Sequence, residues 1–156
     1  MRVTIVCVGH KMPAWIRTGF GEYVKRLPPE IRVDLVELKP EERGSGKTAE
    51  KATALEGARI LAAIPDGATV YALDEKGRTV TTQGLAVMLA GWMRDATHPA
   101  FVIGGADGLS DEVKERADKL VSLSALTLPH ALARVVLAEQ LYRASSILAN
   151  HPYHRE

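Results

Sequence analysis

The C-terminal end of the chain concentrates side chains that could move protons and hold phosphates. Its last residues read NHPYHRE (150–156) and contain two histidines, a tyrosine and an arginine. Histidine changes charge near neutral pH, and an aromatic ring beside cationic groups is typical of surfaces that stack on bases and contact phosphates. No cysteine or carboxylate cluster accompanies His151 and His154, so we expect no metal site. The segment therefore favours a nucleic-acid contact.

A second candidate site is SLSALTLPHALAR (122–134). A strand ends here in small and hydroxyl-bearing residues, and a proline then opens a helix on which His130 and Arg134 lie one turn apart. A flat ring such as adenine could lie among Leu126, Leu128 and backbone groups that hydrogen-bond to it. From spacing alone, His130 could equally cap its own helix.

A glycine-rich turn precedes that site. FVIGGADGLS (101–110) reads as a strand, a turn and the start of a capped helix. Gly104, Gly105 and Gly108 would let a ligand approach the backbone closely. The alternative is a sharp corner with no ligand.

The segment ERGSGKTAE (42–50) ends like a phosphate-binding P-loop but lacks its beginning. The motif needs a glycine five residues before Gly46, where the chain has Glu41, followed by Glu42. Two carboxylates there would repel phosphates. We therefore expect a basic loop, with cations such as Lys47, or simply a solvated one, and not a nucleotide hydrolase. VCVGHKMP likewise has one glycine where a dinucleotide fingerprint needs three.

Alternating strands and helices must position these segments. Apolar runs predict strands over 2–9, 32–39, 68–74, 100–105 and 120–127. Helical patterns and their caps predict helices over 13–27, 48–64, 82–94, 110–119 and 130–149. The first, third and fourth strands are nearly continuously apolar and should be covered on both faces, whereas 32–39 alternates and should lie nearer an edge. The pattern predicts an α/β fold with a mainly parallel sheet flanked by helices.

The composition excludes several classes of protein. The chain has 156 residues, a formal net charge of +1 and one cysteine. An internal disulfide is therefore impossible, and Cys7 in an apolar run should be a buried thiol. No stretch is long and apolar enough for a membrane span, and the N-terminus lacks the pattern of a signal peptide. We expect a cytoplasmic protein.

The last helix is apolar on more than one face, which favours packing against both the sheet and a second copy of the chain. A fully buried helix within a monomer is the alternative. The residues concerned are Leu132, Val135, Val136, Leu137, Leu141, Tyr142, Ile147 and Leu148.

Several of these stretches together resemble one family. IGGADGLS, SLSALTLPHALARVVLAEQLYRASSI, NHPYHRE, VGHKMPAWIRTGFGEYVKRLP and LDEKG are similar to motifs of the ribosomal RNA large subunit methyltransferase H family, whose members are small SPOUT-class methyltransferases. The resemblance covers essentially the whole chain. It implies a single SPOUT domain over residues 1–156 with a C-terminal trefoil knot, and a homodimer. The implied reaction transfers a methyl group from S-adenosylmethionine to N3 of a pseudouridine of 23S rRNA in the assembled ribosome.

The resemblance also implies roles for residues. Those that would hold the methyl donor are Leu73, Gly104, Gly105, Leu123, Ser124, Ala125, Leu126, Thr127 and Leu128. Those that would face the RNA and the reacting base are His130, Arg134, Tyr153, His154 and Arg155. In a dimer of this kind the tail could act on the partner's site.

The implied chemistry requires no metal, because the sulfonium of the donor is already electrophilic. N3 of pseudouridine must lose its proton before it becomes a good nucleophile. His130 and His154 are the candidate bases, and Arg134 or Arg155 could stabilise the developing oxyanion. Two other readings stay open: a non-catalytic ribosome-binding module, and a SPOUT methyltransferase that acts on another RNA.

Overall fold

The computed structural model describes residues 1–44 and 46–155. Ser45 of the expected basic loop and Glu156 of the tail motif lie outside these residues. Strands and helices alternate along the described chain as the sequence predicts. In order they are β1 (Arg2–Val8), α1 (Ala14–Val24), β2 (Arg32–Leu38), α2 (Ala49–Ala63), β3 (Thr69–Thr79), α3 (Thr82–Asp95), β4 (Pro99–Ile103), α4 (Asp111–Arg116), β5 (Lys119–Ser122) and α5 (His130–Leu148).

The strands form one parallel sheet in the order β2-β1-β4-β3-β5. The three nearly continuous apolar runs are the inner strands β1, β4 and β3, and the alternating run, β2, is an edge strand. Both placements confirm the sequence prediction, because only strands covered on both faces must be apolar throughout. Because the strands are parallel, their carboxyl ends all lie at one edge of the sheet.

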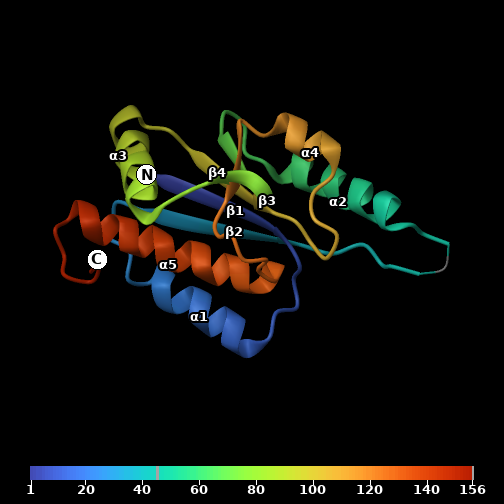
Figure 1. Ribbon diagram of the computed structural model, residues 1–156, viewed down its shortest axis with the longest axis horizontal. Helices are drawn as coiled ribbons and strands as arrows, with labels where there is room; N and C mark the ends of the chain where they lie inside the picture. The colour runs from blue at the N-terminus through green and yellow to red at the C-terminus, as the bar shows by residue number, and fades with distance from the viewer. Residues whose placement is uncertain (45, 156) are drawn as a thin grey trace.

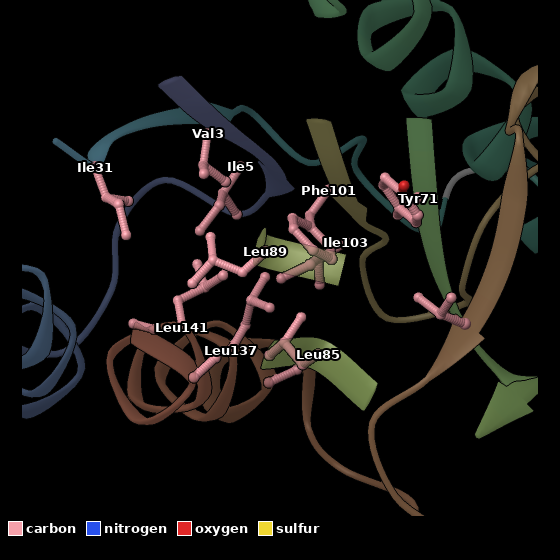
Figure 2. Packing of buried hydrophobic residues seen from close by; sticks show 14 of the residues in the cluster. Val3, Ile5, Ile31, Tyr71, Leu85, Leu89, Phe101, Ile103, Leu137 and Leu141 are labelled. Carbon is pink, nitrogen blue, oxygen red and sulfur yellow. The ribbon is translucent and has the colours of Figure 1, made fainter. Parts of the chain in front are cut away.

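Helices cover both faces of the sheet (Figure 1). Helices α1, α3 and α5 lie on one face, and α2 and α4 on the other. The side chains of β1 alternate between the two layers: Ile5 and Cys7 enter the larger core under α5, and Val6 and Val8 enter the smaller one under α2. Figure 2 shows Ile5 above Leu137 and Leu141 of α5 in the larger core.

Three aromatic rings pack together in the larger core. Trp92 of α3 donates from Nε1 to the Tyr71 hydroxyl at 2.9 Å, and the two ring centroids lie 5.3 Å apart. Phe101 stacks on Tyr71 at 5.4 Å. The indole N–H would be costly to bury without this partner. The other tryptophan, Trp15 at the start of α1, is 63% exposed.

Hydroxyl side chains cap the starts of three helices. The hydroxyls of Thr48, Thr81 and Ser110 accept backbone N–H groups at the starts of α2, α3 and α4. Pro13 and Pro129 instead stand just before α1 and α5 and make no side-chain cap bond.

Strand β5 ends earlier than the sequence predicts. The sequence predicts a strand to residue 127, but β5 ends at Ser122 and the following residues form a turn. The Ser122 hydroxyl donates to the Ser124 carbonyl at 2.9 Å, and the Ser124 hydroxyl accepts from the Leu126 N–H at 2.9 Å. Serine hydroxyls that bond nearby backbone compete with the strand ladder and end it.

Strand β3 is longer than predicted because it resumes after a bulge. Val121 of β5 registers with both Leu73 and Arg78, so residues 74–77 bulge out of the ladder. Gly77 rests on the backbone of β5: a Cβ there would lie 2.7 Å from the Val121 nitrogen. The trefoil knot implied by the resemblance stays a prediction.

Part of the second apolar face of α5 packs against other helices of the same chain. Helix α5 packs against both α1 and α3 as well as the sheet, and a Cβ on Gly19 of α1 would lie 3.5 Å from Val135. The homodimer stays a prediction.

Candidate active site

A cavity of about 690 Å³ opens at the carboxyl ends of β3, β4 and β5. In open parallel α/β sheets this edge is where ligands bind. Most of the lining comes from three segments: 73–76 at the bulge of β3, 103–109 from the end of β4 onward, and 121–130 from the end of β5 to the start of α5. The expected donor-binding residues that line the cavity are Leu73, Gly104, Gly105, Leu123, Ser124, Leu126, Thr127 and Leu128. Ala125 belongs to the same turn and is exposed, but it is not among the lining residues.

The glycine turn after β4 is tightly built. Gly105 and Gly108 form an isolated antiparallel bridge, with the Gly108 N–H donating to the Gly105 carbonyl at 3.1 Å. A Cβ on Gly104 would lie 2.6 Å from the Gly108 carbonyl oxygen, and Gly108 has φ +77°. Larger residues at these two positions would open the turn. Gly105 allows the turn to pack against β1, because a Cβ added to it would lie 3.0 Å from the Val8 side chain.

The turn after β5 presents an unusual apolar side chain. Leu126 is 73% exposed although it lines the cavity. A large apolar side chain left open beside a cavity is typical of a ligand-binding wall. The Thr127 hydroxyl also reaches Glu75 at 3.3 Å, which ties this turn to the β3 bulge.

A carboxylate also stands in the cavity wall. Asp74 forms an ion pair with Lys114 at 3.2 Å. The Lys76 backbone N–H, followed by Lys114, lowers the pKa of Asp74. Asp74 is therefore ionised at neutral pH, and its charge is balanced by Lys114, which lines the same cavity.

His130, the first residue of α5, lines both this cavity and a second one of about 480 Å³. The structure thus brings His130 together with the expected donor site. Burial, followed by the charge of Arg134, lowers the pKa of His130, while Glu56 opposes the shift. A neutral imidazole near pH 7 can accept a proton.

Arg134 lies elsewhere than expected. Its side chain is 1% exposed and packs beneath the end of β1, where it pairs with Glu37 at 2.8 Å and donates to the Gly9 carbonyl at 3.2 Å. Its Nε has no partner among the described residues. Arg134 therefore influences the site through His130 and Gly9 and does not face solvent.

Cys7 lies in the same buried layer and is not a nucleophile. Burial raises the pKa of the Cys7 thiol to about 12. The thiolate, which is the reactive form, is therefore scarce at neutral pH, as the sequence predicts for a core cysteine.

The tail residues gather at the opposite end of α5. The Tyr153 hydroxyl donates to Glu139 at 3.0 Å, and burial with this bond raises the pKa of Tyr153 to about 12. His154 contacts Gln83 at 3.2 Å and Arg143 at 3.4 Å. Arg155 is exposed.

Arg143 is the functional candidate that sequence reasoning missed. Its guanidinium stacks over the Tyr153 ring at 4.6 Å and pairs with Glu139 at 2.7 Å. The sequence does signal a pairing of Arg143, because it lies four residues after Glu139 and residues at this spacing are neighbours on a helix.

The two groups of expected site residues are separated in one chain. Glu139, which holds Tyr153, lies nine residues after His130, or about 14 Å along the helix at ~1.5 Å per residue. Arg143, which touches His154, lies about 20 Å along it. Figure 1 shows the tail beside the C-terminal end of α5, away from the carboxyl ends of the strands.

The P-loop-like segment is not a nucleotide cradle. Lys47 forms an ion pair with Glu41, and so does Arg59. Arg43 bridges Glu56 of α2 and Asp107 of the glycine turn. The described part of this loop is thus held by ion pairs, which the sequence analysis did not foresee.

Two further features concern metals and membranes. The described residues do not gather three or more His, Cys, Asp or Glu side chains that could hold a metal ion. None of the helices formed by residues 1–44 and 46–155 combines the length and apolar character that a membrane crossing needs.

Comparison with known proteins identifies the class first. A model of the family described as "Predicted SPOUT methyltransferase" matches residues 1–154, which agrees with the parallel sheet and the cavity at its carboxyl edge. The chain is therefore a methyltransferase of the SPOUT class.

Curated relatives narrow the class. The ribosomal RNA large subunit methyltransferase H of Herminiimonas arsenicoxydans is 59% identical over 155 residues, which cover 99% of each chain. The protein of the same name from Burkholderia vietnamiensis is 58% identical with the same coverage. The chain belongs to the ribosomal RNA large subunit methyltransferase H family, which confirms the resemblance seen in the motifs.

Solved structures support the fold. A probable methyltransferase from Bordetella pertussis has a TM-score of 0.57 at 18% identity, with 92% of this chain and 95% of that chain covered. TrmJ from Z. mobilis has a TM-score of 0.55 at 15% identity, with 90% and 69% covered. At such identity these likenesses concern the fold alone.

Proposed function

We propose that the protein transfers a methyl group from S-adenosylmethionine to N3 of a pseudouridine in the 23S rRNA of the assembled ribosome. Such a substrate implies action in the cytoplasm. The observation that carries the proposal is the cavity at the carboxyl edge of the sheet, whose wall includes the base candidate His130. The names of the full-length relatives support the substrate class.

The lining of the cavity fits such a donor. Its volume of about 690 Å³ lies within the range of roughly 300–1,000 Å³ typical of small-molecule sites. Leu126, Leu128 and Leu73 offer apolar contacts for a flat adenine ring. The exposed backbone of the turn after β5 offers hydrogen bonds to the ring edge. When bound, S-adenosylmethionine supplies a methyl group on a positively charged sulfur.

His130 is suited to accept the proton of the target. The imide nitrogen N3 becomes a nucleophile when its proton leaves. The lowered pKa of His130 keeps the imidazole neutral and ready to take that proton at N3. As N3 gains the methyl group, the proton resides on His130 until solvent removes it.

The tail is proposed to complete the site of a partner chain. Tyr153, His154 and Arg143 lie about 14 Å or more from His130 along α5 and are held there by Glu139 and Gln83. A two-fold dimer with antiparallel α5 helices would bring the tail of one chain to the donor cavity of the other. His154 and Arg155 would then contact the RNA.

The test is methyl transfer from labelled S-adenosylmethionine to ribosomes from cells that lack this activity, with nucleoside mass spectrometry of the product. Label on one pseudouridine of the 23S rRNA is the expected result. If the protein bound S-adenosylmethionine but transferred no label to ribosomes, the proposed substrate would be wrong. If the protein neither bound the donor nor transferred label, a non-catalytic ribosome-binding module would be the remaining reading.

A further inference from the structure

A second cavity adjoins the donor cavity and shares His130 with it. It has a volume of about 480 Å³ and is lined by the segment 8–12 after β1, by Pro40, Glu41 and Arg43, and by the glycine turn. Gly105, Ala106 and His130 line both cavities. A molecule in the second cavity would therefore lie against the same imidazole as the methyl donor.

Gly9 is a buried member of the lining of this cavity. Gly9 has φ +125°, a region that side chains disfavour, and its N–H donates to the Leu38 carbonyl at 2.7 Å. A Cβ on Gly9 would lie 3.0 Å from the Met12 methyl, 3.3 Å from Arg134 and 3.7 Å from His130. The lack of a side chain at Gly9 thus lets the apolar end of Met12, the Arg134 guanidinium and the His130 imidazole pack closely against the backbone there.

The rim of the cavity carries an unpaired positive charge. Arg43 is neutralised by Glu56 and Asp107, and Glu41 is neutralised by two cations of its own. Lys11 is exposed and has no ion-pair or hydrogen-bond partner in the described part of the chain. His10 beside it is likewise exposed and unpaired there. An anion at this rim would meet Lys11 without competition from a local carboxylate.

We infer that the second cavity receives the target nucleotide, with its base beside Met12, its imide edge toward His130, and a flanking phosphate at Lys11. This assignment rests on the proposed function. A volume of about 480 Å³ suffices for one nucleotide, since sites for small ligands begin at roughly 300 Å³. The Met12 side chain offers the base an apolar contact, and a lysine supplies the point charge that positions a phosphate. Because Gly105, Ala106 and His130 line both cavities, the imide edge would lie where the two cavities meet, next to the general base His130 and the donor.

The first test measures steady-state methyl transfer to ribosomes by Lys11→Ala, Lys11→Arg and a control, Lys119→Ala. Lys119 is an exposed lysine at the opposite, amino end of β5. Lys11→Ala should raise the KM for ribosomes about tenfold. The slope of log affinity against log salt concentration should fall by about 1, as expected for the loss of one phosphate contact. Lys11→Arg should restore most of the loss, and Lys119→Ala should match wild type. Affinity for the donor should be unchanged in all three.

The second test maps a bound probe directly. Pseudouridine 5′-monophosphate is added to methyl-labelled full-length protein saturated with S-adenosylhomocysteine, and NMR follows the Met12, Ala106 and Leu126 methyl groups. The inference expects shifts at Met12 and Ala106 with Leu126 unmoved. Shifts at Leu126 alone, or no shift together with an unchanged KM in Lys11→Ala, would overturn it.

A competing occupant is the tail of a second copy. If Tyr153→Ala moved the Met12 methyl resonance without nucleotide, the tail would fill the cavity and the inference would be wrong. Failure of the proposed function is recognised separately, because wild-type protein would then transfer no methyl group to ribosomes at all.

Discussion

The guanidinium of Arg43 and the carboxylate of Asp107 form an ion pair of 3.0 Å across 64 residues of chain. Arg43 also pairs with Glu56 at 2.6 Å, and that buried carboxylate accepts the Glu41 backbone N–H at 2.9 Å. One side chain thus joins the loop before α2, helix α2 and the glycine turn of the donor cavity. The loop therefore positions the turn.

Arg43→Ala should weaken binding of the donor. Release of Asp107 frees the glycine turn, so we expect a loss of about three- to tenfold in affinity for S-adenosylhomocysteine by calorimetry. Glu56 is left buried without its cation, which should cost about 2 kcal/mol, less than for a fully buried pair because Arg43 keeps 30% of its side-chain exposure. Arg59→Ala, which removes a different ion pair of the same loop, is the control and should keep the affinity for the donor.

His130→Gln should remove the chemical step and keep the donor. We expect kcat to fall by about 10²- to 10³-fold, as for loss of a general base, with binding of S-adenosylhomocysteine preserved. In wild type the base is the neutral imidazole, so the rate should rise as pH increases through a pKa below 6.5 and then level off. A rate that still falls in the same acid range in His130→Gln would assign the base to another residue.

Two inactive variants should restore each other if the tail completes a partner's site. His154→Ala should lose methyl transfer and keep donor binding. When the His154→Ala protein is mixed and re-equilibrated with the His130→Gln protein, heterodimers form. One of the two sites in each heterodimer then has both a native His130 and a native His154. Statistical mixing then predicts about a quarter of wild-type activity. No recovery, or a monomer in sedimentation at micromolar concentration, would contradict the shared site.

Gly57→Ala should destabilise the protein through Ser110. A Cβ on Gly57 would lie 2.2 Å from the Ser110 hydroxyl that caps α4. We expect a loss of about 1–3 kcal/mol in urea unfolding. Because a glycine at position 110 removes the clash and keeps most of the cap, adding Ser110→Gly should cost less than the sum of the two changes. Gly21→Ala in α1, with nothing within 4 Å of the new methyl, should instead be neutral or stabilising.

Much of the fold could be predicted from local patterns. Continuous apolar runs identified the inner strands β1, β3 and β4, and helical patterns identified helices such as α3. These features depend on neighbours in sequence. The end of β5 and the bulge of β3 could not be predicted, since they depend on serine hydroxyls that turn the backbone and on the contact of Gly77 with Val121.

The candidate site divides in the same way. The stretch from Leu123 to Leu128 could be assigned because its motif is contiguous. The burial of Arg134 could not, because its partner Glu37 lies on an edge strand 97 residues away. The same holds for Arg43, whose two carboxylates come from separate elements. Long-range ion pairs leave no periodicity in a sequence.

The two tryptophans give the molecule separate optical reporters. Trp92 is 5% exposed and bonded to Tyr71, so its fluorescence should report on the integrity of the core. Trp15, 63% exposed and three residues after Met12 of the second cavity, should emit at longer wavelength and respond to molecules arriving at that surface. With Trp92→Phe, quenching of the remaining emission would follow association; with Trp15→Phe, the remaining emission would follow unfolding. A single protein thus offers independent signals for its interior and for its binding face.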